Sequence, residues 1–449
     1  MTTPDAHDDR LTPAELEIDT IGRCLLPSPV ARHLGDSAVQ YVGAADKVLL
    51  NDSLSGLRAS GGDLTSLPAF EMAGPRDKIF FDPRTVRAGI VTCGGLAPGL
   101  NNVVRGIVIE LWIGYGVRQI YGFRYGYEGL IARHGHVPMN LTPETVAHIH
   151  HDGGTVLGTS RGSQDPAEVV DNLEANGIGI LFVIGGDGTM AGALRINEEA
   201  KRRGLRLAVV GVPKTIDNDV GFIDRSFGFV TAYSAAVEAI RSARVEATAA
   251  RDGVGLVKLM GRHSGFLACQ AALASTEADL VLVPEVPMRL DGETGVFAYI
   301  ERVLARKGHA VVVTAEGTAQ DLIESPTPGG AHDKSGNAKL KDVGVFLRDR
   351  IGAHLQARGR DATVKYIDPS YTIRSIPACP SDSIYCWNMA RNAVHAAMAG
   401  NTGMLIGRWH GRFVHVPISV AIRSKRHVDP DGDLWMSVIE ATGQPRTLV

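Results

Sequence analysis

Short, continuous runs of apolar residues alternate with longer stretches of helical period from Arg87 onward. The runs are rich in Val, Ile and Leu and lack the strict alternation of apolar and polar residues that marks a half-exposed strand. Continuous runs are typical of strands buried on both faces, as in a parallel sheet covered by helices. We therefore predict an α/β fold of the doubly wound class, with strands at residues 88–93, 180–184, 206–212, 254–260, 279–283 and 310–315.

The same pattern predicts how the chain is divided into domains. Residues 1–85 carry loop signals but no strand-helix rhythm, so we expect an N-terminal extension wrapped on the main body. A chain of 449 residues has room for two doubly wound, mostly parallel-sheet (Rossmann-like) domains besides this extension. We place the first domain at 86–220, the second at 221–400, and a C-terminal segment that returns to the core at 401–449.

Composition and charge narrow the class of protein. Hydrophobic residues make up 44% and charged residues 21% of the chain, which excludes disordered, collagen-like and coiled-coil proteins. The net charge of −3 provides no electrostatic footprint for nucleic acid. The 5 cysteines form no CxxC pair, the acidic start does not resemble a secretory signal, and no apolar run approaches the roughly 18 residues of a membrane span. We expect a cytoplasmic protein with no nucleic-acid or membrane partner.

Glycine loops follow two of the predicted strands, at the carboxyl ends where open α/β sheets bind ligands. The first loop contains Gly95 and opens a helix near Asn101, and the second, Gly186 to Thr189, opens a helix from Met190. Glycines at such places let backbone N–H groups approach an anion, although a plain strand-to-helix turn has the same composition. The second loop also holds a carboxylate, Asp187, which suits Mg²⁺ beside phosphates.

Polar clusters follow two further strands. Residues 213–219 (PKTIDND) place two carboxylates, a lysine and a hydroxyl at one strand end, a combination that suits phosphoryl transfer better than a core or a simple turn. Residues 260–265 (MGRHSG) place Arg262 beside a helix start, for which a capping turn is the alternative interpretation. The motifs at 315–317 (AEG) and 371–374 (YTIR) have no meaning in isolation.

Taken together and in this order, the motifs resemble those of the phosphofructokinase family, which phosphorylates fructose 6-phosphate at its 1-hydroxyl. The resemblance covers residues 87 to about 425 and rests on CGGLAPG, GGDGT, PKTIDND, MGRHSG, AEG and YTIR. NAD kinases and lipid kinases share GGDGT but lack PKTIDND and MGR. The extended start resembles the atypical plant, protozoan and bacterial branch, whose members use either ATP or pyrophosphate.

The resemblance implies a phosphate-donor site in the domain at 86–220, a sugar-phosphate site in the domain at 221–400, and a homotetramer. It implies that Mg²⁺ binds Asp187, and that the donor contacts Gly95, Arg161, Gly162, Gly186, Asp187, Gly188 and Thr189. It implies that fructose 6-phosphate contacts Thr215, Ile216, Asp217, Met260, Gly261, Arg262, Glu316, Tyr371, Thr372, Ile373 and Arg374.

The chemistry of the reaction agrees with these roles. A primary hydroxyl is a weak nucleophile, so a carboxylate must accept its proton, and we assign Asp217 as the general base, with Thr215 and Arg262 completing the catalytic group. Negative charge on the transferring group must be balanced by Mg²⁺ and by preorganised cations, for which Arg262 and Lys214 are available together with Arg161. We expect Asp219 to orient its neighbours.

Two positions bear on the choice of donor. Pyrophosphate users of the family have an aspartate at the position of Gly188 and a lysine at that of Lys214, and common bacterial ATP users have glycine at both. An aspartate would oppose the α-phosphate of ATP, so Gly188 favours ATP, and Lys214 does not exclude it. We therefore expect an ATP-dependent 6-phosphofructokinase. The alternatives are a pyrophosphate-dependent enzyme, a catalytically silent regulatory subunit, and a NAD or lipid kinase.

Two departures from the common bacterial pattern concern neighbouring subunits and loops. Those enzymes have an aspartate at the position of Leu96. They also have an arginine at the position of Gly253 that reaches a neighbouring subunit's sugar phosphate, and Arg244 and Arg251 are only candidates to replace it here.

Two other signals receive structural interpretations. We interpret His148, His150 and His151 as a polar helix end, because no second group of metal ligands lies at a recognisable spacing. We interpret the basic run at 423–427 as a solvated face.

Overall fold

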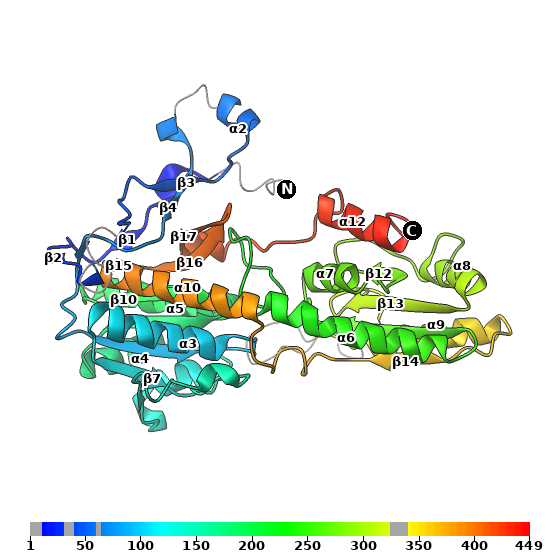
Figure 1. Ribbon diagram of the computed structural model, residues 1–449, viewed down its shortest axis with the longest axis horizontal. Coiled ribbons are helices and arrows are strands. Elements are labelled where there is room, and N and C mark those ends of the chain that lie inside the picture. The colour runs from blue at the N-terminus through cyan, green and yellow to red at the C-terminus, as the bar shows by residue number, and fades with distance from the viewer. Residues whose placement is uncertain (1–10, 31–39, 60–63, 324–339) are drawn as a thin grey trace.

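The computed structural model describes residues 11–30, 40–59, 64–323 and 340–449, and its two main sheets lie at opposite ends of the long axis (Figure 1). The fold is α/β with two Rossmann-like units, as the apolar runs predict. Every predicted strand is present and runs parallel to its neighbours within the sheets. These strands are β6 (Arg87–Thr92), β9 (Ile178–Gly185), β10 (Ala208–Pro213), β11 (Gly253–Leu259), β12 (Leu280–Leu282) and β13 (His309–Ala315).

The larger sheet has a parallel centre and antiparallel edges. Within the described residues its order is β3-β4-β17-β16-β10-β9-β6-β7-β8. The centre comprises β10, β9 and β6 with β16 (Met404–Trp409) and β7 (Gln119–Phe123) on either side. The antiparallel strands are β17 (Arg412–Pro417), β4 (Ala69–Met72), β3 (Lys47–Leu49) and β8 (Met139–Asn140).

The N-terminal extension is partly built into this sheet. Strands β3 and β4 extend its edge beyond β17, and β1 (Asp19–Thr20) pairs with β15 (Asn401–Thr402). Thus residues 47–49 and 69–72 belong to the large sheet rather than lying on its surface. The pairing of β1 with β15 also joins the N-terminal extension to the C-terminal segment.

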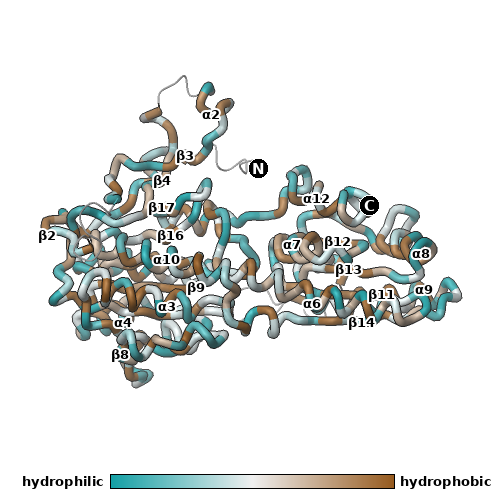
Figure 2. The backbone as a smooth tube through the Cα atoms, in the orientation of Figure 1, coloured by the Kyte–Doolittle hydropathy of each residue, from teal (hydrophilic) through white to brown (hydrophobic). Residues whose placement is uncertain are grey.

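The smaller sheet is wholly parallel, in the order β12-β13-β11-β14, with β14 at Val364–Ile367. Its helices are α6 (Phe229–Thr248), α7 (Phe266–Ser275), α8 (Val296–Lys307) and α9 (Val343–Ala357). All four helices pack against its strands, and the hydropathy-coloured tube is brown along β13 and α7 (Figure 2).

Two helices begin directly after the glycine loops. Helix α3 (Leu100–Ile109) starts one residue before the predicted Asn101, and α5 (Asp187–Arg202) starts before the predicted Met190. Gly186 takes the N-cap position of α5, so Asp187 enters the first turn, where the helix dipole favours a carboxylate.

Two segments cross between the sheets, so the predicted ranges 221–400 and 401–449 each include elements that pack on the large sheet and elements that pack on the small one. Helix α10 (Pro380–Met398) falls in the range 221–400, yet it packs on α3 and β10 of the large sheet (Figure 1). The C-terminal segment forms β16, β17 and α11 (Ile418–Ala421) on the large sheet, and then ends in α12 (Asp433–Thr442), which packs on α7.

Short elements complete the described chain. The strands are β2 (Leu26–Pro27) and β5 (Lys78–Ile79), which pair with each other. The helices and helical turns are α2 (Leu54–Ala59), α4 (Pro166–Ala175), η2 (Pro13–Leu16), η4 (Leu64–Ser66), η5 (Glu110–Tyr115), η6 (Gly126–Leu130), η7 (Ala132–His134) and η8 (Ile149–His151).

The junction between α10 and α6 yields a stability prediction. Buried Asp382 of α10 accepts hydrogen bonds from the backbone N–H and the hydroxyl of Thr231, 2.8 and 2.7 Å away, in the first turn of α6. Asp382→Ala leaves both donors unsatisfied and should lower the free energy of unfolding by roughly 2 kcal/mol. Asp382→Asn, which keeps an acceptor oxygen, should lose less. Chemical denaturation measures both variants, and an alanine variant as stable as the wild type would contradict the prediction.

Candidate active site

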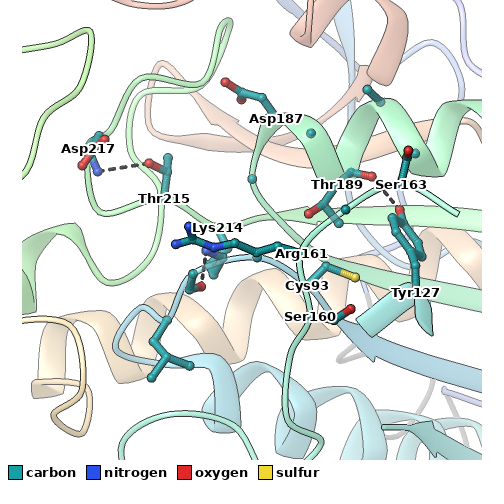
Figure 3. A pocket seen from close by; sticks show the side chains of 18 of the residues that line it. Cys93, Tyr127, Ser160, Arg161, Ser163, Asp187, Thr189, Lys214, Thr215 and Asp217 are labelled. Atoms are coloured by element: carbon teal, nitrogen blue, oxygen red, sulfur yellow. Dashed lines mark hydrogen bonds between the residues drawn. The ribbon is translucent and has the colours of Figure 1, made fainter. Parts of the chain in front are cut away.

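A cavity of about 760 Å³ lies where the carboxyl ends of strands from both sheets meet. Its wall includes the loops after β6, β9 and β10 of the large sheet, and Met260 and Arg262 after β11 of the small sheet. Parallel strands bring their carboxyl ends to one edge, which explains why segments far apart in the sequence share this wall. Figure 3 shows Asp187, Lys214 and Asp217 around the cavity.

The loop after β6 is surrounded by cationic side chains. A Cβ atom built on Gly95 would lie 3.8 Å from Nη2 of Arg161 and 3.9 Å from Nη1 of Arg374. A Cβ atom on Gly94, where φ is +81°, would lie 4.0 Å from Nζ of Lys214. Exposed glycine backbone with three cations beside it suits a polyphosphate anion, because N–H groups and positive charges then converge on the same oxygens.

The loop after β9 leaves open space toward the cavity. Gly188 lines the cavity, and a Cβ atom built on it would meet no heavy atom within 4 Å. The first turn of α5 is fixed from behind, where the hydroxyl of Tyr127 donates to the carbonyl of Thr189 over 2.6 Å. Any discrimination at position 188 must therefore act on a ligand, because the protein itself accommodates a side chain there.

Lys214 is a buried cation that joins two of these loops. Its Nζ donates to the carbonyl oxygen of Gly95 over 2.6 Å, and its backbone N–H donates to the carbonyl of Gly185 over 2.9 Å. Burial lowers the pKa of Lys214 to about 8, although the neighbouring Asp217 opposes this shift. The positive charge of Lys214 is thus present at neutral pH and lost above pH 8.

The loop after β10 holds its polar side chains by internal hydrogen bonds. The hydroxyl of Thr215 accepts from the backbone N–H of Asp217 and donates to Oδ1 of Asp219, both over 3.0 Å. Asn218 has a positive φ of 57°, which asparagine tolerates, and its Oδ1 accepts from the backbone N–H of Ser226 over 2.9 Å. This turn directs Asp217 into the cavity.

Asp217 has the properties of a proton acceptor. Burial raises its pKa, and the charges of Asp219 and Glu316 raise it further, against the opposing backbone N–H of Arg262. Its Oδ1 is buried and has no hydrogen-bond partner within the part of the chain that the structure describes. A buried carboxylate oxygen with a raised pKa and a free lone pair at a cavity wall suits general-base catalysis.

Asp187 and Asp219 form a pair of carboxylates that share one cation, Lys425. Nζ of Lys425 lies 2.9 Å from Oδ2 of Asp187 and 3.3 Å from Oδ2 of Asp219. Burial raises the pKa of Asp187, Asp219 raises it further, and Lys425 opposes both. Carboxylate oxygens beside a phosphate cradle are the ligands that Mg²⁺ takes, since it binds one or two carboxylates and completes its shell with waters and phosphates.

Glu316 does not line the cavity but interacts electrostatically with basic side chains, among them Arg262, which does line it. Burial raises its pKa, and the charges of Arg262, Lys258 and Arg374 oppose the rise. Its backbone N–H donates to the carbonyl of Leu259 at the end of β11 over 2.8 Å, which fixes the motif at 315–317 beside the motif that contains Arg262.

The structure brings most of the predicted site residues to one cavity. Those that line it are Gly95, Arg161, Gly162, Gly186, Asp187, Gly188, Thr189, Lys214, Thr215, Ile216, Asp217, Met260, Arg262 and Arg374. The wall also includes residues that the sequence analysis did not select, among them Tyr127, Arg195 and Lys425.

The YTIR motif is divided between surface, core and cavity. Tyr371 is 75% exposed and lies under the guanidinium of Arg374, 4.7 Å from ring centroid to Cζ. Thr372 donates its hydroxyl to the carbonyl of Pro369 over 2.9 Å, and Ile373 is buried in the core. Only Arg374 of this motif lines the cavity within the chain, and it lies beside the glycine loop that contains Gly95.

The histidines at 148–151 and the basic run at 423–427 are both predicted to be structural features rather than parts of a site. The rings of His150 and His151 lie 4.0 Å apart between centroids, and no group of three or more potential metal ligands occurs among the described residues. In the basic run, Arg423 pairs with Glu15 at the surface, but Lys425 lines the cavity. The interpretation of a solvated face is therefore wrong for Lys425.

Glycine loops, cations and a buried carboxylate lie where the parallel strands of the two sheets end, an arrangement that suits a phosphorylated ligand next to a proton acceptor. The family model described as Phosphofructokinase matches residues 87–397. The chain belongs to the phosphofructokinase family.

Relatives agree with this membership, and a solved structure shares the fold. The chain is 52% identical to an ATP-dependent 6-phosphofructokinase of Amycolatopsis methanolica, covering 96% of this chain and 95% of the relative. It is 44% identical to the protein of the same name in Borreliella burgdorferi, covering 96% and 97%. A pyrophosphate-dependent phosphofructokinase of Marinobacter aquaeolei shares the fold, with a TM-score of 0.64 at 20% identity over 78% of this chain and 87% of the other.

The described helices add one finding about membranes. None of them is both long enough and apolar enough to cross a bilayer.

The lowered pKa of Lys214 yields a pH prediction. Because the cation is lost as pH rises through 8, affinity for tripolyphosphate should fall roughly tenfold between pH 7.5 and 9.5. Lys214→Arg, whose guanidinium stays charged, should show little change over the same range. Titration calorimetry measures both proteins, and a wild-type affinity that is constant across this range would contradict the prediction.

Proposed function

We propose that the protein is an ATP-dependent 6-phosphofructokinase, which transfers the γ-phosphoryl group of ATP to the 1-hydroxyl of fructose 6-phosphate in glycolysis. The observation that carries this proposal is the free Oδ1 of buried Asp217 in a cavity that also contains two glycine loops and several cations. The relatives named as ATP-dependent 6-phosphofructokinases support the choice of reaction and donor.

Asp217 acts as the general base. The sugar hydroxyl donates its proton to the free Oδ1 while the oxygen attacks the γ-phosphorus, and the bond from that phosphorus to the leaving oxygen of ADP breaks. The raised pKa of Asp217 makes the carboxylate a better proton acceptor than an exposed aspartate. Thr215 orients this group, because its hydroxyl accepts the backbone N–H of Asp217.

The donor binds along the two glycine loops. The N–H groups near Gly95 and Gly186 face the phosphates, and Arg161 and Lys214 balance their charge. Gly162, Gly188 and Thr189 complete the contacts. Asp187 would hold Mg²⁺, which supplies charge stabilisation on the phosphates, and the adjacent Asp219 would contribute a second carboxylate.

Fructose 6-phosphate binds on the side of the small sheet. Arg262 and Glu316, which follow the carboxyl ends of β11 and β13 and interact electrostatically, bind the sugar and the transferring group. The further contacts that we propose are Thr215, Ile216, Met260, Gly261, Tyr371, Thr372, Ile373 and Arg374. Tyr371 is exposed and Ile373 is buried away from the cavity, so these two contribute through the backbone or by supporting Arg374.

A tetramer and a cytoplasmic location complete the proposal. Tyr371 is exposed and is therefore accessible to a neighbouring subunit beside the proposed sugar-phosphate site. Position 253 contributes no side chain to such a contact, because a Cβ atom there would lie 2.1 Å from the carbonyl oxygen of Ala247. Light scattering measures the mass of the assembly.

The role of Asp217 yields the first kinetic prediction. Asp217→Asn should lower kcat about 10²- to 10⁴-fold with a smaller change in KM, since the amide cannot accept the proton. A coupled assay of fructose 1,6-bisphosphate formation measures both parameters.

The matched control lies on the same loop. Asp224→Asn changes an exposed aspartate outside the cavity whose Oδ2 accepts the backbone N–H of Gly411, a role that the amide oxygen retains. It should keep wild-type kcat. Normal turnover by Asp217→Asn would remove Asp217 from the role of base.

The open space at Gly188 yields a prediction about donor choice. Gly188→Asp fits the protein without a clash, so it should fold normally but raise the KM for ATP about tenfold or more, because a carboxylate opposes the α-phosphate. Gly188→Asn has the same shape without the charge and should raise it less. Unchanged ATP kinetics in the aspartate variant would refute the electrostatic argument for ATP.

A further inference from the structure

Lys425 lines the catalytic cavity, yet the proposed reaction gives it no role. Its ammonium group lies between two carboxylates, 2.9 Å from Asp187 and 3.3 Å from Asp219. The side chain is 37% exposed, so the ammonium is accessible from the cavity as well as bound to the protein. The ammonium therefore contacts the same carboxylate oxygens that a divalent metal would coordinate.

The backbone around Lys425 is tied to the loop that carries the catalytic carboxylate. Lys425 forms an antiparallel bridge with Val220, and the backbone N–H of Arg426 donates to the carbonyl of Asp219 over 3.0 Å. On the other side, Nδ1 of His427 lies 2.8 Å from the carbonyl of His263 in the small-sheet half of the site. Because the backbone is fixed on both sides, only the flexible side chain of Lys425 can leave the carboxylate pair.

The ammonium stays charged in this position. The two carboxylates that flank it, 2.9 and 3.3 Å away, favour its charged form. The carboxylate pair is thus neutralised in part by a cation that belongs to the protein.

We propose that Lys425 occupies the position of the divalent cation between Asp187 and Asp219 when no nucleotide is bound, and thereby keeps the free metal out. This inference rests on the proposed function, which places Mg²⁺ at Asp187. An ammonium group and a divalent ion repel each other strongly at the distance of one carboxylate, so they do not share the pair.

The charge around the carboxylate pair is different when a metal binds together with a polyphosphate. The phosphates carry negative charge to the same place, and the side chain of Lys425 turns from the carboxylates to the phosphate oxygens while the metal takes the carboxylates. Lys425 therefore weakens the binding of free metal and strengthens the binding of the nucleotide. These opposite effects separate it from a residue that only stabilises the fold.

The test measures the binding of Mn²⁺ to the full chain without nucleotide at pH 8. The electron paramagnetic resonance signal of the free ion reports how much Mn²⁺ remains unbound. Lys425→Met should bind Mn²⁺ at least about tenfold more tightly than the wild type. In calorimetry without metal, the same variant should bind ADP more weakly than the wild type. Lys425→Arg keeps the charge and should behave as the wild type in both measurements.

The matched control is Arg423→Met, which removes a cation from the same segment at the surface, where Arg423 pairs with Glu15. It should change neither affinity. If Lys425→Met does not fold, Lys425→Gln provides the same two measurements. Adding Asp187→Asn to the lysine variant should abolish its tight Mn²⁺ binding.

Equal Mn²⁺ affinity in the wild type and the lysine variant would overturn the inference, as would tight binding that survives Asp187→Asn. Neither result bears on the proposed reaction, because the wild type would still turn over fructose 6-phosphate with ATP. Conversely, an absence of that turnover in the wild type refutes the proposed function whatever the Mn²⁺ measurements give.

Discussion

The structure depends most on the burial of several carboxylates around one cavity. Asp187, Asp217 and Glu316 all have raised pKa values because burial disfavours their charged forms, and Asp219 adds its charge to the first two. Such a group is stable only if cations and hydrogen-bond donors face it. The cations that line the cavity come from separate segments of the chain: Arg161, Arg195, Lys214, Arg262, Arg374 and Lys425.

This electrostatic requirement explains why the two sheets must be held together. Asp217 belongs to a loop of the large sheet, whereas Arg262 and Glu316 follow strands of the small sheet. Helix α6 leads from the loop that carries Asp217 to the small sheet, α10 returns to the large sheet, and the C-terminal segment crosses again with Lys425 in the crossing. Each connection passes close to the cavity, so that the fold and the charge balance depend on each other.

Much of this arrangement could be predicted from the sequence, because its strongest signals are local. Continuous apolar runs reveal buried parallel strands, and the residues directly after them reveal the edge where ligands bind. The same reasoning located Asp187, Lys214, Asp217 and Arg262, which the structure places on one cavity wall.

The remainder depends on contacts that leave no local pattern. Strands β16 and β17 contain polar and basic residues, and their hairpin turns at His410 and Gly411, where φ is positive at both positions. Lys425 lies in a run of charges that is ordinarily solvated, and only the tertiary pairing with Asp187 and Asp219 shows where its ammonium is. The exposure of Tyr371 likewise depends on packing that the sequence does not encode locally.

The most direct test of the proposed reaction is the initial rate of the wild-type protein with fructose 6-phosphate and Mg²⁺, comparing ATP with pyrophosphate at matched concentrations. We expect fructose 1,6-bisphosphate to form with ATP and not with pyrophosphate, because the space around Gly188 is open where we propose that the α-phosphate of ATP lies. Turnover with pyrophosphate alone would mean that Lys214 outweighs Gly188 in the choice of donor. The absence of turnover with either donor would contradict the assignment of Asp217 as a working general base.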